Sequence, residues 1–426
     1  MMPRELVPTA ATGTAVRRAR AHADVTTTGG MRMTGAAARR LIASVPRNSR
    51  DARSSRWGSY ADWCAENGWD TAEPGAVLSH LADLADRGHP AATLEAHFGT
   101  LRGLRTIGES PLSGAEIKSC QQIITHRAGE EADDPDVEPG PLQADGVTPD
   151  DLRQMLRTLD RTTVRGKRDA VVLLIDWWMA GRASEPARLN LHDVKITTVK
   201  VPDPATHGGT IRVKALVIKL RRSKADQNAR GHEIRILAPG DDELCPIRAL
   251  EKWLAVLADD GQLTPGPLLR RVDRHGNIGA KAAGRHTADP KRRGGITAET
   301  VSDIVTATAR AAELTPTPTP EETAAAAQAK QEAHAAAAAA PTTEDAGVIL
   351  KAWRAAKRAA QQAVRRITGH SMRRGCIQAM LDAGHPAEKV ALHSRHSPSS
   401  SAFDVYRKNR LAWHETTTRG VLDLAA

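Results

Sequence analysis

The sequence has few aromatic residues, few cysteines and no long apolar run. Two tyrosines are present among 426 residues, so only Tyr60 and Tyr406 can supply a phenol. The four cysteines lie far apart and form no CxxC pair, which argues against a disulfide framework or a zinc module and favours a reducing cytoplasm. No stretch of about 18 apolar residues exists, which argues against a membrane span. The first 35 residues contain arginines but no apolar segment, so we expect no secretory signal.

Charge is unevenly distributed along the chain. Lysine and arginine total 60 against 50 acids, which gives a net charge of +10. Residues 1–50 hold nine arginines and two acids, and residues 351–410 hold thirteen basic residues and three acids. By contrast, Glu130–Glu138 contains six acids and no base. Two basic blocks on either side of an acidic segment favour a polyanionic partner.

The length and the changes in composition predict several domains. We expect a basic, largely disordered arm at 1–45, a helical domain at 46–128, an acidic linker at 129–147 and a larger C-terminal domain at 148–426. The C-terminal domain contains a low-complexity insertion at 315–345, which begins with a TPTPTP run and continues Ala-rich. A short helix is expected within the arm, around Ala36–Ala43.

Apolar spacing predicts the secondary structure of both domains. The fold class expected is an all-α domain followed by an α/β mixed domain that is mostly helical with a small antiparallel sheet. Helices are predicted at Ser55–Asn67, Pro74–Arg87, Ala91–Thr106, Ser113–Arg127, Gly166–Ala180, 242–258, 297–312, Ala346–Thr368 and His370–Ala383. A further helix begins at Thr148, where Thr-Pro-Asp-Asp resembles an N-cap. Strands are predicted at Val194–Val201, Thr210–Ser223 and His232–Leu237.

Four short segments contain the residues best suited to chemistry. They are GRASEP with Arg182 and Glu185, RSKADQ with Lys224, HSMRRG with His370 and Arg373, and the region from His396 to Tyr406. A phenol that attacks a phosphodiester produces a pentavalent species with added negative charge, and arginine binds such oxygens bidentately. The phenol needs a base and the leaving alkoxide needs a proton. Two arginines, a lysine, two histidines and a tyrosine meet these needs without a metal.

This set of residues resembles the tyrosine recombinase (phage integrase) family. The family order is Arg, Lys, His-x-x-Arg, His or Trp, and Tyr. It is matched here by the set Arg182, Lys224, His370, Arg373, His396 and Tyr406. The similarity covers about 148–420, including RDAVVLLIDWWMAGRASEPARLNLHDV and SRHSPSSSAFDVYRKNRLAWHETTTRGVLDL. It extends more weakly to YADWCAENGW and HPAATLEAHFGTLRGL, which look like the family's SAM-like core-binding domain.

The resemblance implies a role for each residue. Tyr406 would form a 3′-phosphotyrosine and expel a 5′-hydroxyl, while Arg182 and Arg373 would hold the nonbridging oxygens. Lys224 would protonate the leaving oxygen. His370 would act as the base and His396 would donate a hydrogen bond to the phosphate. Glu185 would support the cluster from behind, and neither a cofactor, a metal nor ATP would be needed.

Some positions depart from the family or have other interpretations. Lys214 and Lys219 are alternatives to Lys224, because the segment after Arg182 is longer than usual. Arg395 stands where glycine is common before the histidine, and the insertion has no assignable family role. His393 and His396 could share a metal, although no third ligand is evident. Tyr60 is expected in the helical core, the Trp177–Met179 run in packing, and Arg374 at the surface or on a DNA backbone.

The sequence therefore predicts a site-specific DNA recombinase, with the integrase or excisionase activity of a mobile element. The expected partners are double-stranded DNA, a homotetramer on two DNA sites and accessory DNA-bending or directionality proteins. We expect a cytoplasmic, nucleoid-associated protein with no membrane association. A type IB topoisomerase-like relaxing enzyme and a non-catalytic DNA-binding or architectural protein are the alternatives. Residues 1–45 form either an arm-site DNA-binding element or a basic tail, and the segment Leu411–Leu424 would dock on a neighbouring protomer.

Overall fold

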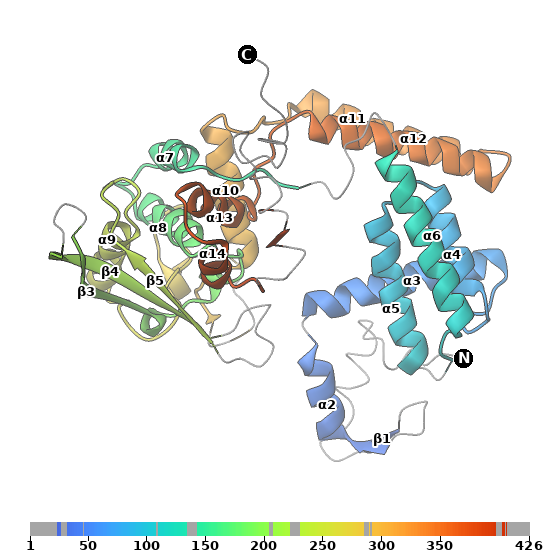
Figure 1. Ribbon diagram of the computed structural model, residues 1–426, viewed down its shortest axis with the longest axis horizontal. Coiled ribbons are helices and arrows are strands. Elements are labelled where there is room, and N and C mark those ends of the chain that lie inside the picture. Colours follow the sequence, from blue (N-terminus) through green and yellow to red (C-terminus); the bar gives the residue numbers. More distant parts are fainter. Residues whose placement is uncertain are drawn as a thin grey trace, which may run out of the picture. The chain divides into compact units, whose positions relative to one another are not determined.

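The structure is a computed structural model of the 426-residue chain. It describes residues 24–26, 32–45, 47–107, 110–133, 143–203, 208–221, 231–284, 289, 292–397, 403, 404 and 406. The chain divides into two compact units (Figure 1). The helical unit comprises Met1–Leu142 and Pro318–Ala363, and the mixed unit comprises Gln143–Thr317 and Val364–Ala426.

Helices α3 to α6 build the core of the helical unit (Figure 1). Their bounds are α3 Arg47–Asn67, α4 Ala76–Asp86, α5 Ala91–Ile107 and α6 Gly114–Ala132. The core contains Tyr60, which is fully buried as predicted and donates its hydroxyl to the Thr71 carbonyl at 2.9 Å. Arg105 is also buried and donates to the carbonyls of Thr71 and Ala72 at 3.1 and 2.8 Å. These contacts fix the turn between α3 and α4, because buried carbonyls need donors.

The described part of the N-terminal segment has regular structure. A two-stranded antiparallel pair, β1 Asp24–Thr26 and β2 Arg32–Thr34, precedes α2 Gly35–Ser44. The helix expected around Ala36–Ala43 is confirmed. The strands were not predicted, since three-residue strands leave almost no periodic signal.

The low-complexity segment predicted at 315–345 contains α11 Pro320–Ala338 and the start of α12 Thr343–Gln362. The two helices form a hairpin that groups with the helical unit. α11 buries no residue, as its alanine-rich sequence leads one to expect. α12 packs near the end of α4, where Lys351 lies against Gly88 and Arg354 Nη2 is 2.9 Å from His89 Nε2.

The mixed unit packs helices against a three-stranded antiparallel sheet in the order β3-β4-β5 (Figure 1). The strands are β3 Val194–Pro202, β4 Thr210–Leu220 and β5 His232–Leu237. Leu216, Ile218 and Ile236 are buried in the core, and on β5 the alternate positions Glu233, Arg235 and Leu237 are exposed. The remaining helices are α7 Pro149–Arg157, α8 Val164–Trp178, α9 Pro246–Asp259, α10 Ala298–Ala311, α13 Ser371–Asp382 and α14 Ala387–Ser394, with short 3-10 turns η1 Pro186–Arg188, η2 Leu191–Asp193 and η3 Gly279–Lys281. The predicted fold class, mostly helical with a small antiparallel sheet, is confirmed.

Two local contacts place the ends of α8 and α13. Trp177 is buried and donates its indole N–H to the Val147 carbonyl at 2.8 Å, which confirms its packing role. Gly375 on α13 lies so close to Val147 that an added Cβ would be 1.8 Å from its carbonyl oxygen. The close approach brings α13 against the segment that enters α7. Among the described residues, none forms a helix long and apolar enough to cross a membrane.

Candidate active site

The predicted site residues come from three places in the mixed unit. Arg182 and Glu185 follow α8 in the turn that leads to η1, His370 and Arg373 lie at the start of α13, and His396 follows α14. Tyr406 lies a short distance beyond His396 in the sequence. The segment Arg222–Arg230, which includes Lys224, lies outside the described residues.

Arg373 is the centre of the cluster and is completely buried. Its Nη1 donates to the Ala180 carbonyl at 2.6 Å, and its Nη2 donates to the Ser394 carbonyl. Nη2 is also 3.1 Å from His396 Nε2. Burial and the neighbouring cations Arg182 and Arg395 lower the pKa of Arg373 to about 10. The guanidinium therefore stays charged at neutral pH and is held rigidly by backbone oxygens.

Arg182 is partly exposed and is oriented by Glu185. Its backbone N–H donates to Glu185 Oε2 at 3.0 Å, and its Nη1 is 3.4 Å from Glu185 Oε1. A quarter of the Arg182 side chain is exposed, compared with 4% for Glu185. An arginine that is anchored at one side and open at the other can bind an anion from solvent.

His396 lies between the arginines and the tyrosine. Its Nδ1 is 2.9 Å from Ser394 Oγ, and its ring centroid is 5.9 Å from that of Tyr406. Loss of hydration, then the charges of Arg373, Arg182 and Arg395, lower its pKa to about 3. The imidazole is therefore neutral at pH 7 and retains one N–H that it can donate.

Tyr406 is 8% exposed and packs at 6.0 Å, centroid to centroid, from Phe403. Burial raises the pKa of its phenol, while the positive charges of Arg373, Arg374 and Arg182 oppose that rise. The phenol is thus protonated at neutral pH and lies in a field that favours its anion. A base is needed to remove its proton.

His370 precedes α13 at its N-cap position and is exposed at the surface. Partial loss of hydration and the charges of Arg373, Arg182 and Arg374 lower its pKa. The neutral imidazole can accept a proton, which suits the base expected from the sequence.

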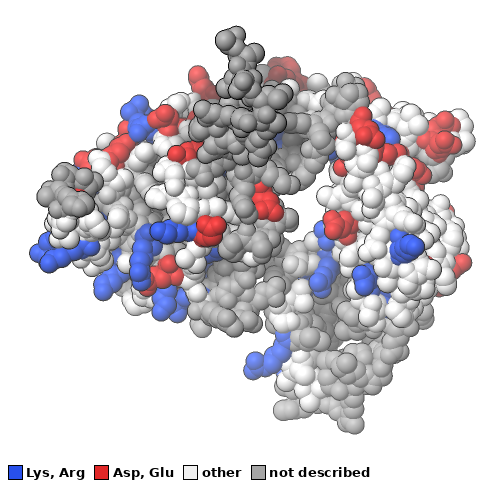
Figure 2. All heavy atoms as spheres, viewed as in Figure 1, with Lys and Arg blue, Asp and Glu red and all other residues white. Residues whose placement is uncertain are grey.

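The choice of Lys224 over Lys214 and Lys219 as the catalytic lysine stays a prediction. Lys214 Nζ is 2.6 Å from Glu251 Oε1 in an exposed ion pair. Lys219 is exposed on β4. Lys and Arg side chains gather over the β3–β5 sheet on the face drawn in Figure 2.

Sequence reasoning missed two buried residues that shape the site. Arg395, noted only as a departure from glycine, is buried with φ +61° and contacts Glu185 at 2.6 Å. Asp176 is completely buried, and within the part of the chain that the structure describes no hydrogen-bond donor reaches its carboxyl oxygens. Burial, then the charge of Glu185, raise its pKa to about 8. A local pattern reveals neither the Arg395–Glu185 contact nor the burial of Asp176, because both depend on the packing of α8 against α13 and α14.

Metal binding by His393 and His396 finds no support in the part of the chain that the structure describes. His393 Nε2 is 2.9 Å from the Trp178 carbonyl oxygen. No group of three or more His, Cys, Asp or Glu residues suited to a metal occurs among the described residues.

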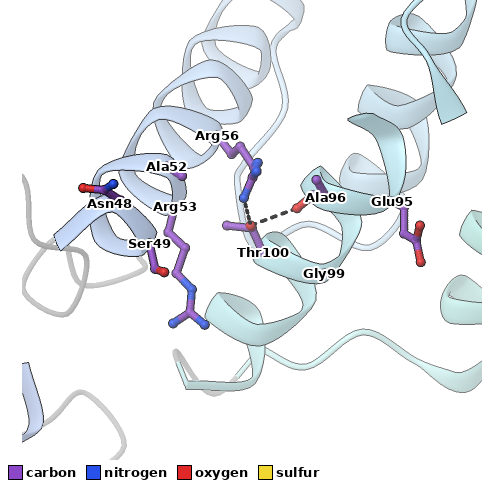
Figure 3. A pocket seen from close by; sticks show the side chains of 9 residues that line it. All are labelled: Asn48, Ser49, Ala52, Arg53, Arg56, Glu95, Ala96, Gly99 and Thr100. Carbon is purple, nitrogen blue, oxygen red and sulfur yellow. Dashed lines mark hydrogen bonds between the residues drawn. The ribbon is translucent and has the colours of Figure 1, made fainter. Parts of the chain in front are cut away.

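The helical unit contains a separate open hollow of about 410 Å³ between α3 and α5 (Figure 3). Its polar lining includes Asn48, Ser49, Arg53 and Arg56. Arg56 donates to Thr100 Oγ1 at 3.2 Å, whereas the Arg53 side chain extends into the space between the helices (Figure 3). A groove with an extended guanidinium and small neighbouring side chains can accept a phosphate.

The mixed unit thus presents a phenol among arginines and neutral imidazoles, and the chain is similar in sequence to one curated relative. It is 25% identical over 250 residues to the "Integrase/recombinase xerD homolog" of Selenomonas ruminantium. The match covers 56% of this chain and 63% of that relative, so it spans less than two thirds of the relative's length. No protein-family profile matches the chain.

Two solved structures of lambda integrase are also similar to the chain. A dimer bound to a COC′ core site aligns at 11% identity and a TM-score of 0.41, covering 88% of this chain and 76% of that chain. A tetramer bound to a Holliday junction aligns at 11% identity and a TM-score of 0.34, covering 91% and 92%.

Proposed function

We propose that the protein is a site-specific DNA recombinase that cuts and rejoins DNA strands through a 3′-phosphotyrosine. The observation that carries the proposal is the buried Tyr406 phenol, which lies beside His396 and in the field of three arginines. Such a field stabilises both a phenolate and the charge of a pentavalent phosphorus. The relation to an integrase/recombinase homolog supports the same activity.

The chemistry divides among the site residues as follows. His370 takes the proton of the Tyr406 hydroxyl, and the phenolate oxygen attacks the scissile phosphorus. Arg182 and Arg373 bind the nonbridging oxygens, while His396 donates a hydrogen bond to one of them. Lys224, which follows β4 in the sequence, gives a proton to the leaving 5′-oxygen. The tyrosine–phosphate ester conserves the bond energy, so that a 5′-hydroxyl of another strand can reverse the step.

The proposed partners are two DNA duplexes and three further copies of the chain. The gathering of basic side chains over the β3–β5 sheet supports DNA binding by the mixed unit (Figure 2). The groove between α3 and α5 supports phosphate contacts by the helical unit (Figure 3). The tetramer, accessory bending or directionality proteins, a mobile-element origin and a cytoplasmic nucleoid location remain predictions.

Covalent trapping tests the activity. The protein is incubated with nicked duplexes drawn from the DNA that flanks its gene, quenched in SDS and separated on a gel. A slow-migrating adduct is expected for the wild type and for Tyr60→Phe, and none for Tyr406→Phe. Because the chain has only these two tyrosines, the pair forms a matched control. An adduct that survives Tyr406→Phe contradicts the proposed nucleophile.

A second assay separates recombination from topoisomerase-like relaxation. Two plasmid-borne sites are mixed with the protein, and the products are analysed for strand exchange and for supercoiling. Exchange products support the recombinase, whereas relaxation without exchange supports the alternative. Specific DNA binding without either product supports the non-catalytic alternative.

A further inference from the structure

Arg395 occupies a backbone position that disfavours its own residue type. Its φ of +61° and ψ of +35° lie in the left-handed region, which glycine adopts far more readily than a residue with a Cβ. The side chain is nevertheless buried, at 4% exposure. An arginine that is kept both buried and in a disfavoured conformation must make contacts that offset both penalties.

Those contacts join the ends of α8 and α14. Arg395 Nη2 donates to Glu185 Oε2 at 2.6 Å and to the Ala180 carbonyl at 3.0 Å. Its Nη1 donates to the Met179 carbonyl at 2.9 Å. The two carbonyls belong to the turn that immediately precedes Arg182. Arg395 is therefore bonded both to that turn and to the carboxylate behind Arg182.

Glu185 contacts two cations unequally. Its shorter contact is with Arg395, at 2.6 Å, and the side chains of Glu185 and Arg395 are each only 4% exposed. Its contact with the Arg182 guanidinium is longer, at 3.4 Å, and Arg182 is 25% exposed. A buried carboxylate requires a cation, and Arg395 meets that requirement within the protein.

We infer that Arg395 is a positioning residue that neutralises Glu185 and thereby leaves the charges of Arg182 and Arg373 available to the scissile phosphate. The inference rests on the proposed function. With three arginines against Glu185, two positive charges face the site, and Asp176 is mostly uncharged at pH 7 because burial raises its pKa to about 8. Glycine at position 395 leaves Glu185 with Arg182 as its nearest cation and removes one positive charge from the cluster. A pentavalent intermediate gains negative charge, so the missing cation slows the chemical step more than DNA binding.

The decisive variant is Arg395→Gly, because glycine accepts the left-handed backbone and the chain should fold. Its cleavage rate is measured in single turnover on a nicked duplex, together with DNA affinity. We expect a rate loss of about 100-fold, the size expected for a lost charge-stabilising contact, with affinity almost unchanged. Arg157→Ala serves as the control, because this exposed arginine on α7 is paired with Glu243 and lies outside the sheet, and it should cleave normally.

Two further measurements distinguish charge balance from simple packing. Adding Glu185→Gln to Arg395→Gly removes the unpaired carboxylate and should restore most of the lost rate. A methylphosphonate at the scissile position removes one negative charge from the substrate, so the penalty of Arg395→Gly should shrink markedly on it. The inference is overturned if neither Glu185→Gln nor the methylphosphonate reduces the rate loss caused by Arg395→Gly. It is also overturned if the Arg395→Gly protein cleaves at the wild-type rate.

The stability of the same variants provides a readout that does not depend on activity. In urea unfolding, Glu185→Gln should relieve much of the destabilisation caused by Arg395→Gly, as a coupled pair requires. If the two substitutions change the free energy of unfolding additively, Arg395 and Glu185 do not form the stabilising ion pair. A third outcome separates the two proposals. If the wild-type protein forms no adduct on any duplex while the unfolding of the variants shows this coupling, the proposed function is overturned and Arg395 remains the counter-ion of Glu185.

Discussion

At the scale of single residues, the site depends on a phenol and two imidazoles that are neutral at pH 7. Tyr406 is buried, which raises the pKa of its phenol, and burial together with the adjacent arginines lowers the pKa values of His370 and His396. The types and order of these residues mark them as a candidate site for phosphodiester chemistry, while their individual roles follow from the family resemblance and stay predictions. The contribution of Arg395 could not be predicted, because its partner lies 210 residues away in the sequence.

Acid should destabilise the helical unit through its buried histidines. Burial, then the neighbouring His97, lower the pKa of His80 to about 3, and burial with Arg354 lowers that of His89 to about 4. The unfolded chain therefore binds more protons below pH 6.5, and stability falls as the pH drops from 6.5 towards these values. At pH 5 the expected loss is about 2 kcal/mol for each such histidine.

Urea unfolding followed by tryptophan fluorescence between pH 7.5 and 5 tests this. His80→Gln removes one titrating group and should flatten the pH dependence, while His126→Gln, an exposed histidine on α6, should leave it as in the wild type. A midpoint that does not change with pH contradicts the burial of neutral histidines.

The buried Asp176 should make the protein less stable as the pH rises, which is the opposite of the effect of the buried histidines. Its folded pKa of about 8 lies above the unfolded value of 3.8, so folding requires proton uptake at neutral pH. The stability linked to this group is fully present below pH 3.8 and is lost as the pH rises through about 8. Asp176→Asn should therefore raise the free energy of unfolding at pH 8, measured by urea titration. A substantial fall in stability at that pH indicates that the ionised carboxylate is needed.

At the scale of elements, helices with strong local signals could be predicted and those made by long-range packing could not. Thr148 caps α7 with a reciprocal Asp151 contact, as the Thr-Pro-Asp-Asp sequence predicts. α14 was missed because it has only eight residues and little apolar periodicity. The attachment of α12 near α4 depends on Gly347 lying close to the Asp86 carbonyl, a contact with no local signature.

A pair of glycine substitutions tests how α13 is placed. An added Cβ at Gly375 would overlap Val147, so Gly375→Ala should displace α13 together with Arg373 and cost several kcal/mol. Gly58 on α3 has open space around it, and Gly58→Ala should stabilise that helix by about 0.5–1 kcal/mol. Urea unfolding and adduct formation measure both effects. Normal stability and activity in Gly375→Ala would show that α13 does not pack as described.

At the scale of the whole molecule, the account predicts DNA binding dominated by phosphate contacts. The chain carries a net charge of +10, and basic side chains gather over the sheet (Figure 2). The basic blocks could be read from the composition. The grouping of 318–363 with the helical unit could not, because an alanine-rich sequence does not specify its packing partner.

Binding should weaken steeply with salt. For six to ten phosphate contacts the affinity should fall by about 10³–10⁵ between 50 and 200 mM salt. Arg53→Ala should reduce the slope of log affinity against log salt by about one, since its guanidinium extends into the groove between α3 and α5 (Figure 3). Arg248→Ala, which removes a surface ion pair with Asp242, serves as the comparison and should change the slope less. Equal slopes for the two variants would contradict phosphate binding in the groove.

The central claim is that Tyr406 becomes covalently joined to the 3′ side of a cut DNA strand. The most direct measurement is mass spectrometry of the adduct after protease and nuclease digestion, using strands labelled separately at their 3′ and 5′ ends. The account predicts one peptide that contains Tyr406 with a 3′-linked nucleotide, and a free 5′-hydroxyl on the released strand. A peptide that contains another residue, or a 5′-linked nucleotide on Tyr406, would contradict it.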